Sequence, residues 1–390
     1  MFSIKVKSIE SLLFFISAAL VPMYFTDFRF DGGGLIIRLS DLMAVFIILC
    51  FLFLFSKERI KIKIPSGFNY VLLFLIYCFC NALLKAGLVK ALIATVQWSM
   101  ILFSLVVVYS NAVKNPERFR AIFINTLLTI CFFTVVYHFL DGHFTRYKYL
   151  GDAKYAFGLT GVILLSCSLY FNDKKYLRPL ILLYPFILLS LERKGILVFH
   201  VVLIFYAFYT LKPLYKLLMA AIIAFATLIF IIFFDLSFLN HITFFEYSEL
   251  EILYLDEETA RWISNMHRQS LLENGWHIFT EHPLFGVGPK MLLFYMSDYY
   301  INDDMVLYTH NVFLDSLIEQ GVFGLFLLLL PYIVFVMKKF KKMTQRDKTV
   351  FFGLCIYSAF MLFFMSAGAP SMILLYLPLF MGFLIHKNNT

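Results

Sequence analysis

The chain alternates between long apolar runs and short polar segments that carry most of its charge. A helix needs about 20 mostly apolar residues to cross a bilayer, and continuous runs predict helices rather than the alternating strands of a barrel. The pattern therefore predicts an all-α polytopic membrane protein, a single membrane domain over residues 1–390 with one large extracytoplasmic loop at residues 236–310. We expect about twelve transmembrane helices, at residues 9–25, 35–56, 67–83, 88–110, 119–140, 155–171, 176–191, 195–211, 214–235, 321–337, 349–366 and 369–386.

The composition supports this interpretation. Hydrophobic residues make up 61% of the chain and charged residues 15%, which excludes an ordinary soluble domain. The first apolar run is a poor match to a cleavable signal peptide, so we interpret it as the first span. All six cysteines lie in apolar runs, so the sequence predicts neither a disulfide framework nor a thiolate metal site.

The net charge of +8 comes mainly from loops between the apolar runs. If the N-terminus is cytoplasmic, most of the 33 Lys and Arg fall on the cytoplasmic side, as membrane topology requires. We therefore expect both termini in the cytoplasm and residues 236–310 outside. No basic segment is combined with an aromatic stacking platform, so nucleic acid is not an expected partner.

Some Lys and Arg residues fall on the outer side, against the preference of positive residues for the cytoplasmic side. They form three groups in separate segments: Arg146, Lys148 and Lys154; Arg193 and Lys194; Arg261, Arg268 and Lys290. Single side chains of this kind often lie at the membrane surface with their stems in lipid. Three groups on one side are better explained by an anionic ligand at the outer face.

Residues 256–280 are expected to form a helix in the outer loop. Acidic residues begin the segment and Pro283 follows it, as at the two ends of a helix. Arg261 and Arg268 are seven residues apart and share a face. A helix anchored on the membrane surface by Trp276 and Phe279 is at least as good an interpretation of this segment as a binding site.

The segment 286–289, Gly-Val-Gly-Pro, predicts a turn with positive φ angles or a close backbone approach. It lacks the preceding strand of a dinucleotide site, which excludes that interpretation.

Thr309, His310 and Asn311 precede a predicted amphipathic helix, residues 311–320, with Asp315 and Glu319 among its polar positions. Thr309 or Asn311 suits a helix cap. Gly321 and Gly324 then allow close helix packing. His310 suits a base or an orienting donor, although a lone histidine is more often a structural group.

Metal and cofactor signals are weak. The sequence has no HExxH or GxSxG motif, and the adjacent Asp303 and Asp304 diverge too much to clamp a cation. We expect no metal and no cofactor.

Four stretches together resemble the O-antigen ligase/polymerase-like family of bacterial envelope glycosyltransferases. They are the His310–Gly324 segment, with Asn311, Leu314, Glu319 and Gly321; Arg268 followed by Pro283, Gly286 and Gly288; Ser190 to Gly195; and Arg146 to Gly151.

This resemblance implies a helical membrane bundle related to the C-type glycosyltransferases. Its members transfer a glycan from a polyprenyl diphosphate to a sugar hydroxyl. By this resemblance Arg193 and Arg268 bind the diphosphate and His310 activates the acceptor, with inversion and without metal. Lys194, Arg261 and Arg146 are further candidates for binding phosphate or glycan.

The resemblance thus implies a polymerase of O-antigen or other surface polysaccharide in the bacterial cytoplasmic (inner) membrane. Expected partners are lipid-linked glycans and membrane lipid, with a chain-length regulator and a flippase as further candidates. The alternative is an O-antigen ligase that transfers the glycan to lipid A-core. A lipid-linked oligosaccharide flippase, from another class, would need more charge at mid-membrane depth than the apolar runs carry.

Overall fold

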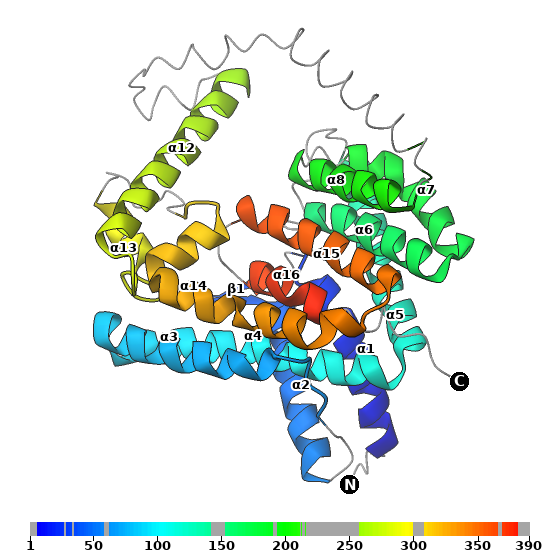
Figure 1. Ribbon diagram of the computed structural model, residues 1–390, viewed down its shortest axis with the longest axis horizontal. Helices are drawn as coiled ribbons and strands as arrows, with labels where there is room; N and C mark the ends of the chain where they lie inside the picture. Colours follow the sequence, from blue (N-terminus) through cyan, green and yellow to red (C-terminus); the bar gives the residue numbers. More distant parts are fainter. Residues whose placement is uncertain are drawn as a thin grey trace.

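The computed structural model describes residues 6–26, 29–32, 35–57, 62–141, 153–189, 193–210, 257–298, 308–365 and 369–380, with Lys212 and Tyr215. Helices dominate this part of the chain, and one two-stranded ribbon lies among them (Figure 1). In chain order the elements are α1 (Val6–Met23), β1 (Arg29–Gly32), β2 (Leu35–Arg38), α2 (Leu39–Ser56), η1 (Phe68–Tyr70), α3 (Val71–Ala86), α4 (Leu88–Lys114), α5 (Pro116–Asp141), α6 (Ala153–Phe171), α7 (Lys174–Leu189), α8 (Arg193–Thr210), α12 (Glu257–Glu281), α13 (Leu292–Ser297), α14 (Val312–Lys339), η2 (Phe340–Lys342), α15 (Gln345–Phe363) and α16 (Ala369–Phe380).

The expected spans coincide with helices over most of their length, except residues 214–235, which lie outside the described residues apart from Tyr215. In the described part, five segments are long and apolar enough to cross a membrane: Leu39–Ser56, Phe68–Ala86, Leu88–Lys114, Pro116–Tyr137 and Val312–Lys342. Shorter apolar helices include Tyr155–Phe171 and Lys194–Tyr209. The helical class is therefore confirmed, and the count of twelve spans stays a prediction.

One expected span begins differently. Residues 35–56 were expected to form a single helix, but Leu35–Arg38 pair with Arg29–Gly32 in an antiparallel ribbon. The β-branched Ile36 and Ile37 favour this extended conformation, and α2 starts only after them. The ribbon is a small departure from the expected all-α class.

Two apolar cores organise the molecule. The larger, which we call the bundle core, takes buried residues from α1 to α8 and from α14 to α16. The smaller, which we call the cap core, gathers seven buried residues from α12, α13, the turn between them and the start of α14. These residues are Leu271, Ile278, Val287, Leu292, Met296, Leu314 and Ile318. In Figure 1 helix α12 extends away from the bundle on the side where α13 lies.

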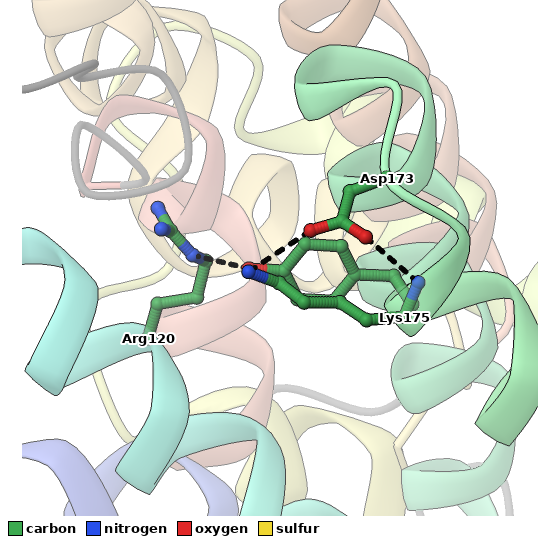
Figure 2. A network of polar contacts seen from close by, with 4 residues as sticks. Arg120, Asp173 and Lys175 are labelled. Atoms are coloured by element: carbon green, nitrogen blue, oxygen red, sulfur yellow. Dashed lines mark hydrogen bonds and ion pairs between the residues drawn. The ribbon is translucent and has the colours of Figure 1, made fainter.

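A polar network ties α5 to the connection between α6 and α7. The buried Arg120 donates from Nε to the Tyr176 hydroxyl at 3.0 Å, and its guanidinium lies 4.0 Å from the centre of the Phe171 ring. Lys175 forms an ion pair with Asp173 at 3.0 Å beside it (Figure 2). This network marks the C-terminal end of α6, and the features described next lie at its N-terminal end.

Candidate functional site

The turn at residues 309–311, the histidine turn, is fixed by hydrogen bonds to the helix that follows. The Asn311 side chain accepts from the backbone N–H groups of Phe313 and Leu314 at 3.0 and 3.1 Å, which confirms it as the cap of α14. The buried Asp315 accepts from the Thr309 N–H at 3.0 Å and from its hydroxyl at 2.7 Å. Between them His310 adopts a left-handed backbone with φ of 56°.

Three other basic groups act on the imidazole of His310. The pKa of His310 is lowered to about 4, first by burial and then by the neighbouring charges of Arg268, Lys194 and His267. The side chain is half-buried, whereas Arg268 is exposed on α12. The fold therefore gathers basic groups from α8 and α12 around a histidine that is neutral at physiological pH.

Lys194 reaches this place from the first turn of α8. Its ammonium donates a hydrogen bond to the carbonyl oxygen of Phe364, just after α15, and lies 5.6 Å from the centre of the Tyr155 ring. A Cβ on Gly158 would lie 3.2 Å from the Cα of Gly195, so α6 and α8 approach each other closely here. The N-terminal ends of α6 and α8 therefore meet the C-terminal end of α15.

The start of α14 joins the same meeting point. The Phe313 and Phe363 rings lie 5.0 Å apart between their centres. Helix α12 packs on the histidine turn, since a Cβ on Gly275 would lie 2.7 Å from the Thr309 methyl group. Gly275 is seven residues from Arg268, and residues two helical turns apart share a face. The arginine thus lies on the face of α12 that contacts the histidine turn.

The turn at residues 283–288, the glycine turn, is bound to a bend in α14. Val287 and Gly288 donate their N–H groups to the carbonyls of Ile318 and Glu319 at 2.7 and 2.8 Å. The N–H groups of Val322 and Phe323 return two hydrogen bonds to Pro283 and Leu284.

Glycine is required on both sides of this contact. Gly321 has φ of 67° and ψ of −176°, so the helix changes direction there (Figure 1). A Cβ on Gly321 would lie 2.2 Å from the Leu284 carbonyl oxygen, and a Cβ on Gly286 2.4 Å from the Gln320 nitrogen. Gly286 and Gly288 have φ of 66° and 107°, which confirms the predicted turn.

Helix α3 supports the glycine turn with one face. Asn81 donates to the Phe285 carbonyl at 2.9 Å and Lys85 donates to the Gly286 carbonyl at 2.8 Å. Tyr77, one turn earlier, donates to the Phe285 and Gln320 carbonyls. A Cβ on Gly324 would lie 2.7 Å from the Tyr77 ring, as expected of a close helix contact.

The predicted helix at residues 256–280 is confirmed as α12, which ends at Glu281 just before Pro283. Trp276 is 56% exposed and its ring contacts that of Phe279, so a surface anchor remains compatible with the structure. Asp315 departs from its expected polar position, because its carboxylate turns inward to Thr309 and is 1% exposed.

The structure brings His310, Arg268 and Lys194 together. Arg193 is the first residue of α8 and Arg261 lies in α12. Neither side chain is among those that the structure describes. Arg146 lies outside the described residues. Lys290 is not among the groups that act on His310, and its backbone N–H donates to the Glu319 carboxylate at 3.1 Å.

The sequence did not single out His267, Tyr155 or the Asp315 contact. His267 precedes Arg268 directly, which was the available signal, whereas Tyr155 is brought to Lys194 only by the packing of α6 on α8. Among the described side chains, no three His, Cys, Asp or Glu residues gather in a group suited to a metal ion.

Comparison with known proteins places this geometry in context. Residues 179–329, which run from α7 into α14, match a family model described as O-antigen ligase. The resemblance to the O-antigen ligase/polymerase-like family is confirmed. The matched region contains Lys194, Arg268 and His310.

The chain is also similar to a curated protein over part of its length. The chain is 32% identical over 135 residues to the teichuronic acid biosynthesis protein TuaE of Bacillus subtilis (strain 168). The aligned part covers 32% of this chain and 27% of the relative, so it spans about a quarter of that protein's length. Both matches support a place in polysaccharide biosynthesis.

Proposed function

We propose that this protein is a glycosyltransferase that joins polyprenyl-diphosphate-linked repeat units into a surface polysaccharide. One observation carries the proposal: α8, α12 and the histidine turn bring Lys194, Arg268 and a neutral His310 together. This combination provides cations for a diphosphate and a proton acceptor for a hydroxyl. The family match over the same residues supports it.

Arg268 and Lys194 bind the diphosphate in this proposal, with Arg193 beside Lys194 in sequence and Arg261 two turns before Arg268. A guanidinium stays charged and fits phosphate oxygens with two parallel hydrogen bonds. Negative charge grows on the diphosphate as its bond to the sugar breaks, and fixed cations stabilise that charge without reorganising. Arg146 is a further candidate for holding phosphate or glycan.

His310 takes the proton of the acceptor in this proposal. The acceptor oxygen attacks the anomeric carbon, the bond from that carbon to the diphosphate oxygen breaks, and the hydroxyl proton moves to an imidazole nitrogen. Direct displacement inverts the anomeric configuration. Because His310 is neutral before the reaction, one of its ring nitrogens is unprotonated at physiological pH. A bound diphosphate offsets the surrounding cations and favours the protonated imidazole.

We place this site at the outer face of the bacterial cytoplasmic membrane, with both termini in the cytoplasm. The support is the separation of charges along α6. Tyr155 at one end contacts Lys194, and Phe171 at the other end contacts Arg120, which the charge pattern assigns to the cytoplasmic side. Sixteen residues of helix separate them by roughly 24 Å, close to the thickness of a hydrocarbon core.

The decisive experiment is incubation of the purified protein with its lipid-linked repeat unit. A polymerase converts it into a ladder of longer lipid-linked glycans and releases polyprenyl diphosphate. An unchanged repeat unit, in the presence of folded protein, contradicts the proposal. If this protein makes no polymer but transfers a glycan polymerised by another enzyme to lipid A-core, the ligase function is supported instead. That second candidate is favoured by the description of the matched family.

Transport is tested in the same system. A flippase would move the lipid-linked unit across proteoliposomes without making a glycosidic bond.

A further inference from the structure

The buried contact between Asp315 and Thr309 sits directly beside the histidine of the proposed site. Asp315 and Thr309 are each 1% exposed, and the carboxylate takes two hydrogen bonds from Thr309. A carboxylate costs much free energy to bury unless it is well paired, and hydrogen bonds to a charged acceptor are the stronger ones. The pair is therefore a firm anchor at the start of α14.

Thr309 makes a second contact with its other branch. Its methyl group lies where Gly275 leaves room on α12, since a Cβ there would lie 2.7 Å from it. The hydroxyl thus holds the residue to α14 while the methyl group holds it to the helix that carries Arg268. Together with the cap core, Thr309 therefore helps to place α12 and α14 relative to each other.

His310 follows this anchor in a backbone conformation that side chains resist. Its φ of 56° lies in the left-handed region, which costs about 1–2 kcal/mol for a residue with a Cβ. Asn311, the next residue, is tied to Thr309 by an N–H to hydroxyl hydrogen bond at 3.2 Å and caps α14. Bonds on both sides of His310 therefore maintain the strained turn.

We propose that Thr309 and Asp315 are positioning residues, which hold the imidazole of His310 at a fixed place beside Arg268. This inference rests on the proposed role of His310 in glycan transfer. Neither residue contacts the reacting atoms. Their effect passes through the turn, so their loss misplaces the imidazole, and a displacement of about 1 Å can reduce a rate about 100-fold.

The pKa of His310 reports where its imidazole lies. Arg268 and His267 on α12 and Lys194 on α8 lower this pKa, and Asp315 lies on α14, the helix that follows the histidine turn. Burial is the largest cause of its low pKa, so an imidazole released from the turn into water regains a pKa nearer the ordinary 6.5.

The test compares Thr309→Val with Thr309→Ser. Valine keeps the methyl contact with α12 and removes the hydroxyl, and serine does the reverse. Asp315→Asn is the third variant, which keeps the shape of the side chain and removes its charge. Each is purified in detergent, and its unfolding temperature is measured first.

We expect Thr309→Val to lower kcat roughly 10- to 100-fold with little change in KM for the lipid-linked donor, and Thr309→Ser to retain most of the activity. The pKa of His310, measured by NMR titration of ¹³C-histidine protein with His310→Asn for assignment, is expected to rise in Thr309→Val. Asp315→Asn removes a nearby negative charge, which by itself lowers that pKa, so its readout is kcat, which is expected to fall less than in Thr309→Val because an amide oxygen can still accept from Thr309.

The NMR arm needs no glycan transfer, so it separates this inference from the proposed function. An unchanged His310 pKa in folded Thr309→Val overturns the positioning role. A raised pKa in a protein that transfers no glycan even as wild type supports the positioning role and contradicts the proposed function. Equal losses of activity in Thr309→Val and Thr309→Ser, with unchanged pKa, show that packing alone matters and also overturn the inference.

Discussion

The bundle and the cap of this protein are held together by different means. The bundle core is built from side-chain packing, and its outer surface carries large apolar residues such as Leu84, which is 85% exposed. Among the described residues, the cap core has seven buried side chains, and backbone hydrogen bonds join the glycine turn to α14. The difference teaches that the bundle is sensitive to side-chain volume, whereas the cap is sensitive to backbone conformation.

The largest effect is expected at the contact between the glycine turn and α14. In Gly321→Ala the new Cβ would lie 2.2 Å from the Leu284 carbonyl oxygen, and φ is 67°, so the two segments must separate. We expect a loss of about 3 kcal/mol or more of stability and no measurable glycan transfer. Thermal unfolding in detergent and the transfer assay measure the two effects.

Gly87→Ala is the matched control. Gly87 has φ of 83° and ψ of 170°, the same glycine-favoured region as Gly321, with no described atom within 4 Å of a Cβ, so only backbone strain of about 1–3 kcal/mol is added. Equal damage from both variants would show that the close approach is not the cause.

A large effect on activity alone is expected from Arg268→Ala. Removal of one charge that stabilises the departing diphosphate costs about 100- to 1000-fold in kcat/KM. The side chain is exposed, so the unfolding temperature is expected to stay within the error of the measurement. Arg118→Ala is the control, because Arg118 is also exposed and its guanidinium lies 5.4 Å from the Phe14 ring, away from the cap. Similar activity of the two variants would remove Arg268 from the site.

A moderate effect is expected from pH. His310 has a folded pKa of about 4, so it remains a proton acceptor until the pH falls toward that value. We expect the acidic limb of kcat/KM near this pH in wild-type protein, well below the ordinary 6.5. In Lys194→Met one neighbouring cation is lost, which raises the pKa of His310 and moves the limb to higher pH. A limb that does not move between the two proteins would contradict the charge coupling.

The smallest effect is expected on the outer surface of the bundle. Leu84→Ala removes a side chain that packs on little of the protein, so the stability should change by about 0.5 kcal/mol or less. Phe157→Ala, at a site with 0% exposure, is expected to cost about 3–5 kcal/mol. The ratio of the two, from thermal unfolding, measures how far the bundle depends on packing. A large loss from Leu84→Ala would assign that surface to a protein contact.

Much of the helical arrangement could be predicted from the sequence, because long apolar runs leave few alternatives. Helices α4 and α5 begin within a few residues of the positions that hydropathy assigned. The ribbon at Leu35–Arg38 could not be predicted, since an apolar strand and the start of an apolar helix have the same sequence pattern over four residues. The predicted turn at Gly286 was found because glycine with a following proline is a local signal.

The site was predictable in its residue types and not in its support. His310 and Arg268 were singled out by charge and by family resemblance. The inward turn of Asp315 was missed, because its partner Thr309 lies outside the helix whose periodicity assigned Asp315 to a polar face. The bend at Gly321 was also missed, since it depends on carbonyls of Leu284 that lie far away in the chain.

The left-handed backbone at His310 has a practical consequence for anyone who deletes its side chain. Alanine there would remove the imidazole and also disfavour the local geometry, so a dead enzyme would have two causes that no assay can separate. Asparagine accepts that geometry far more readily and carries no basic nitrogen. A loss of activity in His310→Asn can therefore be attributed to the missing imidazole rather than to backbone strain.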